Sequence, residues 1–191
     1  MAEPGISNAG SSNIVIDIGS SYCKLGFAGD DVPQAYLDSV LCQSLYSTYI
    51  GRMAKTEEEG TVMEMYPIVD GIVTNWDVMK SFWTYAFYGQ LRVSPQGQSV
   101  LFTDSPLNST LNREKMAQIM FESFNVSAFY VAMQAVLSLY ASGRTTGVAV
   151  DSGESYTHSV PVYEGIPLRH AIQRTSIITV LAIQQRAEPP F

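Results

Sequence analysis

One pattern occurs twice in this chain of 191 residues and limits the folds that the chain can adopt: an apolar strand that reaches an aspartate and then enters a turn of small residues. The first copy, residues 13–28, reads NIVIDIGSSYCKLGFA, and the second, residues 147–155, reads GVAVDSGES. Ile and Val favour strands, and glycine allows backbone dihedral angles that are closed to other residues. Each copy therefore predicts a β-hairpin with a tight turn.

The first of these turns carries groups that suit a polyphosphate. Ser20 and Ser21 offer hydroxyls beside backbone amides, and consecutive amides in a turn bind anions. Lys24 adds a positive charge, and Asp17 is an acid of the kind that binds a hard cation through water. Two such hairpins that face each other can grip one polyphosphate. A Gly-Ser turn that only reverses the chain is the alternative, and a single hairpin does not decide between them.

The composition argues for a protein with a core and against several classes of partner. Apolar residues make up 46% of the chain, which is enough for a core, and the net charge of −7 argues against nucleic acid. Only Cys23 and Cys42 are present, so a disulfide framework is not expected. Residues 1–13 lack the pattern of a secretory signal, and no apolar run is long enough to cross a membrane.

Apolar spacing predicts further elements along the chain. Helices are expected at 75–91, at 113–124 with Asn112 as the N-cap, and at 135–142 with Gly143 at the end. Strands are expected at 14–18, 22–28, 34–38, 99–103 and 128–133. The apolar stripe of the first helix is interpreted as core packing.

Several long stretches resemble actin. They are residues 23–33 (CKLGFAGDDVP), 71–77 (GIVTNWD), 112–124, and 130–147 (YVAMQAVLSLYASGRTTG). The similarity runs from about residue 14 to about residue 173, with a divergent patch at 38–65, and it covers the front half of an actin chain. The spacing of the two hairpins is also typical of the wider fold that actin shares with sugar kinases and heat-shock-chaperone ATPases.

The resemblance implies an α/β fold: a ribonuclease-H-like actin ATPase subdomain, with a mixed five-stranded sheet flanked by helices and a small, shortened inserted lobe. The domains expected on this basis are a disordered lead at 1–13, an actin-like α/β domain at 14–38 and 66–173, the shortened lobe at 39–65, and a divergent, unrelated tail at 174–191. Within that tail, the apolar run 177–183 either covers a sheet edge or is an aggregation hazard.

The resemblance also implies a site for ATP with Mg²⁺. Asp17 and Asp151 would hold the metal through water, and Lys24 would bridge two phosphates. The remaining cofactor-binding residues lie in the two turns: Gly19, Ser20, Ser21, Ser152, Gly153 and Glu154.

Two residues are implied as catalytic. Gln134 matches the glutamine that orients the attacking water in actins, since a neutral amide can both donate and accept a hydrogen bond. His158 would lie near that water. The alternatives that the residues leave open are that Gln134 caps the following helix and that His158 is a packing residue on an alternating strand.

At four positions the chain departs from the actin pattern. Ser21 and Ser155 stand where the family usually has glycine, and a Cβ there can push the backbone away from a phosphate. Glu154 stands where the family usually has aspartate. Asp70 replaces a modified histidine over the phosphates, and an acid there is expected to repel polyphosphate. These departures predict weakened nucleotide affinity.

The function expected from the resemblance is that of an actin-like cytoskeletal structural or scaffolding protein with an incomplete ATP-binding cleft. It would act through protein contacts at residues 140–146, and it would not be an efficient ATPase. The alternative is a nucleotide-binding filament subunit that hydrolyses ATP. A phosphotransferase is a third class, for which the sequence offers neither an acceptor pocket nor a base. The expected partners are actin or actin-binding proteins, not nucleic acid or membrane, in the cytoplasmic cytoskeleton.

Overall fold

The computed structural model of the protein describes residues 13–43, 48–51 and 63–175. The expected disordered lead therefore lies outside the described residues except for Asn13, which is the first residue of a strand. The divergent tail also lies outside them from residue 176 onward, including the apolar run 177–183.

A mixed five-stranded sheet forms the centre of the molecule, as the resemblance implies. Its strand order is β10-β9-β1-β2-β3. The pairs β1–β9 and β9–β10 are parallel, whereas β1–β2 and β2–β3 are antiparallel. The strands are β1 Asn13–Ile18, β2 Tyr22–Phe27, β3 Ala35–Asp38, β9 Ser99–Asp104 and β10 Ala128–Met133.

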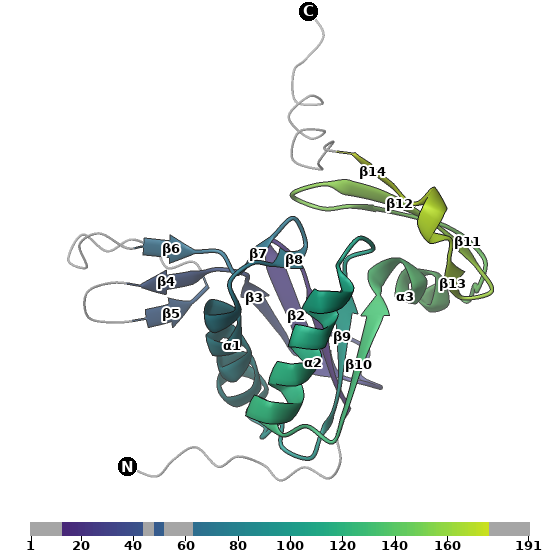
Figure 1. Ribbon diagram of the computed structural model, residues 1–191. Coiled ribbons are helices and arrows are strands. Elements are labelled where there is room, and N and C mark those ends of the chain that lie inside the picture. Colours follow the sequence, from purple (N-terminus) through teal and green to yellow (C-terminus); the bar gives the residue numbers. More distant parts are fainter. Residues whose placement is uncertain (1–12, 44–47, 52–62, 176–191) are drawn as a thin grey trace, which may run out of the picture.

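Helices α1 (Trp76–Thr84) and α2 (Thr110–Phe124) cover one face of this sheet (Figure 1). Alternate residues of β1 point into the same buried cluster as the apolar stripes of both helices. Trp83 of α1 packs on Phe102 of β9 with ring centroids 5.2 Å apart. After α1 the chain continues as a π-helical segment, Tyr85–Leu91, whose Phe87 packs on Phe124 of α2 at 5.2 Å. The core packing predicted for the stripe is confirmed.

The start of α2 differs from the prediction. Its N-cap is Ser109, whose hydroxyl accepts a hydrogen bond from the amide of Asn112 at 3.2 Å. The side chain of Asn112 instead donates to Asn108 Oδ1 at 2.9 Å. Asn112 is therefore inside the first turn, and the prediction that it caps the helix is wrong because a serine three residues earlier occupies that position.

A second sheet follows helix α3 (Gln134–Ala141). It contains β11 (Gly147–Ser152), β12 (Thr157–Tyr163), β13 (Ile166–Pro167) and β14 (Gln173–Thr175), with a 3₁₀ turn at Arg169–Ala171. Helix α3 lies between the two sheets (Figure 1), and its buried Ala135 and Leu139 form a small core with Val160 and Val162 of β12. The C-cap of α3 is Ser142, and Gly143 follows it with φ 72°, so the helix ends where predicted.

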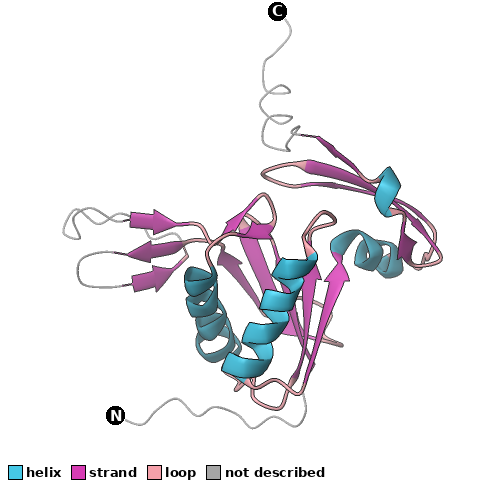
Figure 2. Cartoon of the chain, viewed as in Figure 1, coloured by secondary structure: helices cyan, strands magenta, loops and turns pink. Residues whose placement is uncertain are grey.

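The segment between β3 and α1 forms two small units (Figure 2). Strands β4 (Leu41–Gln43), β5 (Thr48–Ile50) and β6 (Met63–Met65) make a three-stranded sheet within the range predicted for the inserted lobe. Strands β7 (Ile68–Val69) and β8 (Ile72–Val73) form a hairpin whose turn residues, Asp70 and Gly71, both have positive φ. An Asp-Gly pair with this backbone is the preferred two-residue turn of a hairpin.

Candidate functional site

The turns of the two predicted hairpins meet at one cavity of about 560 Å³. Residues of the β1–β2 turn and of the β11–β12 turn line it together. The cavity is lined by these predicted site residues: Asp17, Gly19, Ser20, Ser21, Lys24, Gln134, Asp151, Gly153 and Glu154. Two predicted site residues, Ser152 and His158, are not among the described residues that line it.

Asp17 contacts three side chains in this cavity. Its Oδ2 lies 3.2 Å from Lys24 Nζ. Its Oδ1 accepts hydrogen bonds from Thr103 Oγ1 at 2.6 Å and from Gln134 Nε2 at 3.0 Å. The register of β1 on β2 explains the ion pair, since Asp17 and Lys24 are directly opposite on the same face. Three elements thus hold the carboxylate in one orientation.

Gln134 is the first residue of α3, at the end of the parallel strand β10. Its amide also donates to the carbonyl of Ile18 at 3.1 Å, so the side chain points into the cavity. The N-cap of α3 is Met133, and no side-chain capping bond is found there in the described part of the chain. The alternative in which Gln134 caps the helix is therefore not what the structure shows.

The β1–β2 turn is tight, and its serine hydroxyls are already bonded. A Cβ at position 19 would come within 2.6 Å of the Tyr22 carbonyl oxygen, so this turn requires glycine. The hydroxyl of Ser20 accepts a hydrogen bond from the Gly71 amide at 2.9 Å. The hydroxyl of Ser21 donates to the Glu154 carboxylate across the cavity. The two hairpins are therefore joined directly by side chains at their turns.

The second turn has fewer free groups than expected. The amide of Gly153, predicted to bind phosphate, donates to the Tyr156 carbonyl at 3.0 Å. The hydroxyl of Ser152 lies 2.8 Å from that of Thr157 on the adjacent strand. Both groups therefore form hydrogen bonds within the hairpin. Of the residues predicted for the site here, Asp151 and Glu154 have side chains that line the cavity.

His158 lies inside the second sheet rather than in the cavity. It is only 2% exposed, and its ring centroid is 4.2 Å from that of Tyr156. Burial, and after it the nearby Arg174 cation, lower the pKa of His158. Its Nε2 has no hydrogen-bond partner among the described residues, although it is buried. A buried imidazole nitrogen of this kind calls for a small polar partner such as water.

Four further residues of this region were not identified from the sequence as site residues. Thr103 holds Asp17, as described above. Arg174 Nη2 lies 2.9 Å from Asp70 Oδ2, and its guanidinium stands 4.5 Å from the ring centroid of Tyr156. The Tyr156 hydroxyl donates to Ser105 Oγ at 3.3 Å, and burial raises the pKa of this phenol. The contacts of Tyr156, which directly precedes β12, therefore reach the residue after β9 and strand β14.

The Asp70–Arg174 pair bears on two sequence predictions. Asp70 was expected to repel polyphosphate; its carboxylate is paired with the guanidinium, and the repulsion stays a prediction. Arg174 was assigned to an unrelated tail; it lies in β14, which pairs with β12. Thr103 could have been predicted as a site residue because it is a polar residue at the end of the apolar strand β9. Nothing near Arg174 in the sequence indicates that it contacts Asp70.

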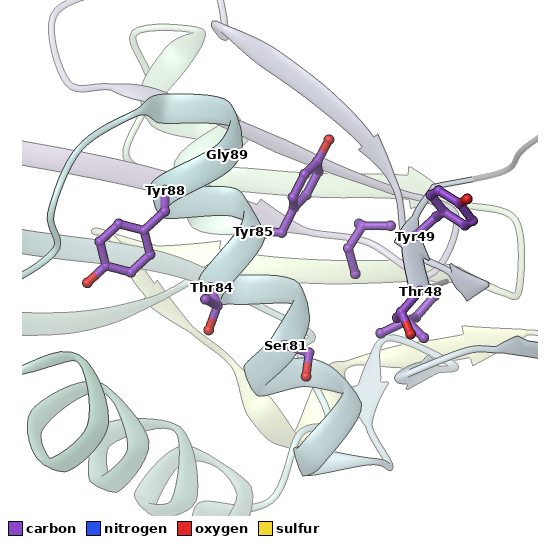
Figure 3. A pocket seen from close by; sticks show the side chains of 9 residues that line it. Thr48, Tyr49, Ser81, Thr84, Tyr85, Tyr88 and Gly89 are labelled. Carbon is purple, nitrogen blue, oxygen red and sulfur yellow. The ribbon is translucent and has the colours of Figure 1, made fainter. Parts of the chain in front are cut away.

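A second cavity of about 560 Å³ lies between the small lobe and the helix after β8 (Figure 3). Figure 3 shows Thr48 and Tyr49 on the strand side and Ser81, Thr84 and Tyr85 on the helix side. The hydroxyls of Ser81 and Thr84 donate to carbonyls of their own helix at 3.2 and 2.9 Å. No predicted site residue lines this cavity, and the hydroxyls of Ser81 and Thr84 are used within their own helix.

The residues of the first cavity fit a magnesium–phosphate group. Three carboxylates and one ammonium line it, so the cavity has a net negative charge and favours a cation such as Mg²⁺. No group of three metal-binding side chains occurs in the described ranges, so Asp17 and Asp151 would hold Mg²⁺ largely through water, as that ion allows. The glycine turn and Lys24 suit phosphate oxygens.

The fold and the site define a class of protein: an α/β protein whose two strand–Asp–turn hairpins, from different sheets, face each other across one cavity. A comparison with protein-family models agrees with this class. The model of the Actin family matches residues 8–181, and the chain belongs to the actin family. The match runs past residue 173, so the divergence expected for 174–191 stays a prediction. No described helix has the length and apolarity needed to cross a membrane.

Proposed function

We propose that this chain is an actin-family cytoskeletal scaffold that acts through protein contacts and binds Mg-nucleotide weakly in the cavity between its hairpins. The observation that carries the proposal is an exposed strip, defined here as residues 140–150, in which Gly147 and Ala149 alone are half-buried. All residues from Tyr140 to Thr146 are exposed, and Val148 and Val150 on β11 are 60% and 68% exposed. Large apolar side chains gathered on one surface are typical of interaction sites.

The position of β11 strengthens this proposal. In the described part of the second sheet, β11 pairs with β12 on one side, and it stands at the end of the strand order. An edge strand offers unpaired backbone groups to another chain. The exposed valines beside that edge supply apolar area for the same partner. We expect actin or an actin-binding protein to occupy this strip.

Weak nucleotide binding is supported by the contacts inside the cavity. Asp17 and Lys24 pair with each other, and Ser21 pairs with Glu154, so a phosphate chain must displace bonds that already exist. In our proposal, Asp17 and Asp151 hold Mg²⁺, Lys24 and the turn amides hold phosphate, and Gln134 orients a water. When bound, the metal would offset the negative charge of the phosphates.

Binding to actin tests the scaffold. The purified chain should bind monomeric or filamentous actin in a co-sedimentation or interferometry assay, and Val150→Asp should weaken that binding at least about tenfold by placing a charge in an apolar contact. Val32→Asp is the matched control, because Val32 is 70% exposed in the turn before β3, outside the strip. Binding that survives Val150→Asp unchanged would contradict this surface.

Calorimetric titration with Mg-ATP tests the cavity. We expect measurable but weak binding that is lost in Asp17→Ala and in Asp151→Ala. Tight binding accompanied by steady ATP hydrolysis would instead favour the filament-subunit alternative. Binding that both alanine variants retain would show that the nucleotide does not use the hairpins.

A further inference from the structure

The cavity shown in Figure 3 lies beside an edge strand of the small lobe. Among the described strands, β5 pairs with β4 alone and ends the order β5-β4-β6. Figure 1 shows β5 as the strand of this lobe that lies nearest to α1. The volume of about 560 Å³ is in the range of roughly 300–1,000 Å³ that is usual for ligand sites. The strand edge and the helix are therefore two walls of one open cleft.

The backbone of β5 has hydrogen-bonding groups directed away from β4. The Gly51 amide donates to the Val40 carbonyl at 2.8 Å, so these two residues form a hydrogen-bonded pair at the end of the β4–β5 ladder. Such pairs alternate with non-hydrogen-bonded pairs, so Tyr49 is bonded to β4, whereas Thr48 and Ile50 direct their N–H and C=O groups to the outer edge. In the described part of the chain, neither Thr48 nor Ile50 has a backbone hydrogen bond at that edge. Both residues can therefore pair with an added strand.

The helix side of the cleft carries an aromatic ring whose position is already fixed. Tyr85 begins the π-helical segment after α1 and is 38% exposed. A Cβ at Gly89 would lie 2.7 Å from the Tyr85 ring, so glycine lets this ring rest against the helix backbone. Gln90 Nε2 donates to the Tyr85 hydroxyl at 2.8 Å. π-Helical turns are rare and frequently occur at functional sites, and this one presents a preformed surface for an apolar side chain.

The side chains of the cleft determine the chemistry of its ligand. None of the described residues that line it is an acid or a base, so a charged side chain would lose hydration there without gaining an ion pair. Tyr49 on the strand side and Tyr85 on the helix side offer aromatic surface (Figure 3). The cleft therefore favours an uncharged, apolar or aromatic side chain.

We infer that this cleft binds an extended peptide segment of a partner protein, which adds a strand to β5 and places an uncharged apolar or aromatic side chain against Tyr85. In this mode of recognition, main-chain hydrogen bonds supply affinity and the side-chain pocket supplies specificity. Three peptide residues opposite β5 span about 10 Å. The site is separate from the nucleotide cavity and from residues 140–150, so it does not depend on the proposed function.

The probe for this site is the capped heptapeptide acetyl-Thr-Val-Thr-Phe-Thr-Val-Thr-amide, which alternates polar and apolar side chains and carries no charge. Amide chemical shifts of the isotope-labelled full chain measure its binding, and we expect saturable shifts at Thr48 and Ile50. Tyr85→Ala should weaken binding about tenfold by removing the aromatic wall. Tyr36→Ala is the matched control, because Tyr36 is 61% exposed on β3 and does not line this cleft.

Methylation of the peptide's own amides tests strand addition without changing the protein. One peptide is methylated at the amides of Phe and both Val residues, and the other at those of the two inner Thr residues. Alternate residues of a strand direct their amides to opposite edges, so one peptide should bind at least about tenfold more weakly and the other about as tightly as the unmodified peptide. Equal effects of the two methylation patterns refute strand addition.

Three further results overturn the inference. No binding of the unmodified heptapeptide to the folded chain refutes the site. Acetyl-Phe-amide that binds as tightly as the heptapeptide would show a pocket for small aromatic molecules instead of a peptide site. A heptapeptide with Lys in place of Phe that binds equally well would refute the preference for an uncharged side chain.

Discussion

Thr103 offers the sharpest test of how the cavity is built, because one hydroxyl serves both the backbone and the site. It accepts a hydrogen bond from the Ile18 amide at 2.9 Å and donates to Asp17 Oδ1 at 2.6 Å. The residue is only 5% exposed, so little water can replace its hydroxyl. Thr103→Val keeps the shape of the side chain and removes both bonds, together with a longer one that Gln134 Nε2 donates to the hydroxyl at 3.3 Å.

The expected cost follows from these two bonds. An amide left without an acceptor in a buried position costs about 1–3 kcal/mol. The lost bond to Asp17 adds less, about 0.5–1 kcal/mol, because the Asp17 side chain is 30% exposed and partly hydrated. We therefore expect Thr103→Val to lower the free energy of unfolding by about 2–3 kcal/mol, which corresponds to roughly 4–12 °C in Tm for a chain of this length.

Urea denaturation followed by circular dichroism measures this loss. Thr103→Ser is the matched control, since it keeps the hydroxyl and removes one methyl group at a cost of about 1 kcal/mol. If Thr103→Val is as stable as Thr103→Ser to within about 0.5 kcal/mol, the hydroxyl does not hold the turn, and the explanation of the Asp17 orientation fails.

Three more predictions concern ionisable groups. Arg113→Met should lower the free energy of unfolding by about 3 kcal/mol, because it leaves Asp104, 5% exposed, without the cation that lies 2.6 Å away; adding Asp104→Asn should restore most of the loss. Asp70→Asn and Arg174→Gln should show a coupling below about 1 kcal/mol in a double-mutant cycle, because their side chains are 50% and 34% exposed. For His158 the folded pKa is lowered by burial and then by Arg174, so the unfolded chain binds the proton better. Neutral His158 therefore contributes fully to stability above the ordinary pKa of 6.5, and this contribution is lost as pH falls from 6.5 toward the folded pKa. We expect Tm to decrease over that pH range, and to decrease less in His158→Gln.

Each of these three has a result that contradicts it. The prediction for Arg113 and Asp104 is contradicted if adding Asp104→Asn to Arg113→Met does not raise the stability of the variant. For the exposed pair, it is a coupling of several kcal/mol. For His158, it is a Tm whose dependence on pH below 6.5 is the same in the wild type and the glutamine variant.

Much of the fold could be predicted because local sequence patterns determine it. The strand at 14–18 and the apolar stripe of α1 were predicted from such patterns, and both predictions were correct. The start of α2 was wrong because Ser109 and Asn112 are both good capping residues and local preference does not choose between them. The hairpin with Asp70 in its turn was missed because its strands have two residues each.

Some residues of the candidate site could likewise be predicted from the sequence, and others could not. Asp17 and Gln134 could be identified because each stands at a strand end within a recognisable motif, and the structure brings them to 3.0 Å. The contacts of Tyr156 and Arg174 could not, because their partners, Ser105 and Asp70, come from other parts of the fold. The local sequence around each of two side chains does not indicate that they will be in contact when they are far apart in the chain.

The position of β1 has a consequence for synthesis of the chain. It lies between β2 and β9, and the residues that join it to β9 are 85 positions apart, as in the bond from Ile18 to Thr103. The β1–β2 hairpin can form as soon as it leaves the ribosome, but the opposite edge of β1 must wait for β9. At ordinary translation rates that wait is roughly 4–17 s. During it the nascent chain presents an open, isoleucine-rich strand, so chaperone binding to the ribosome-bound chain should be strongest before β9 emerges and should fall once it does.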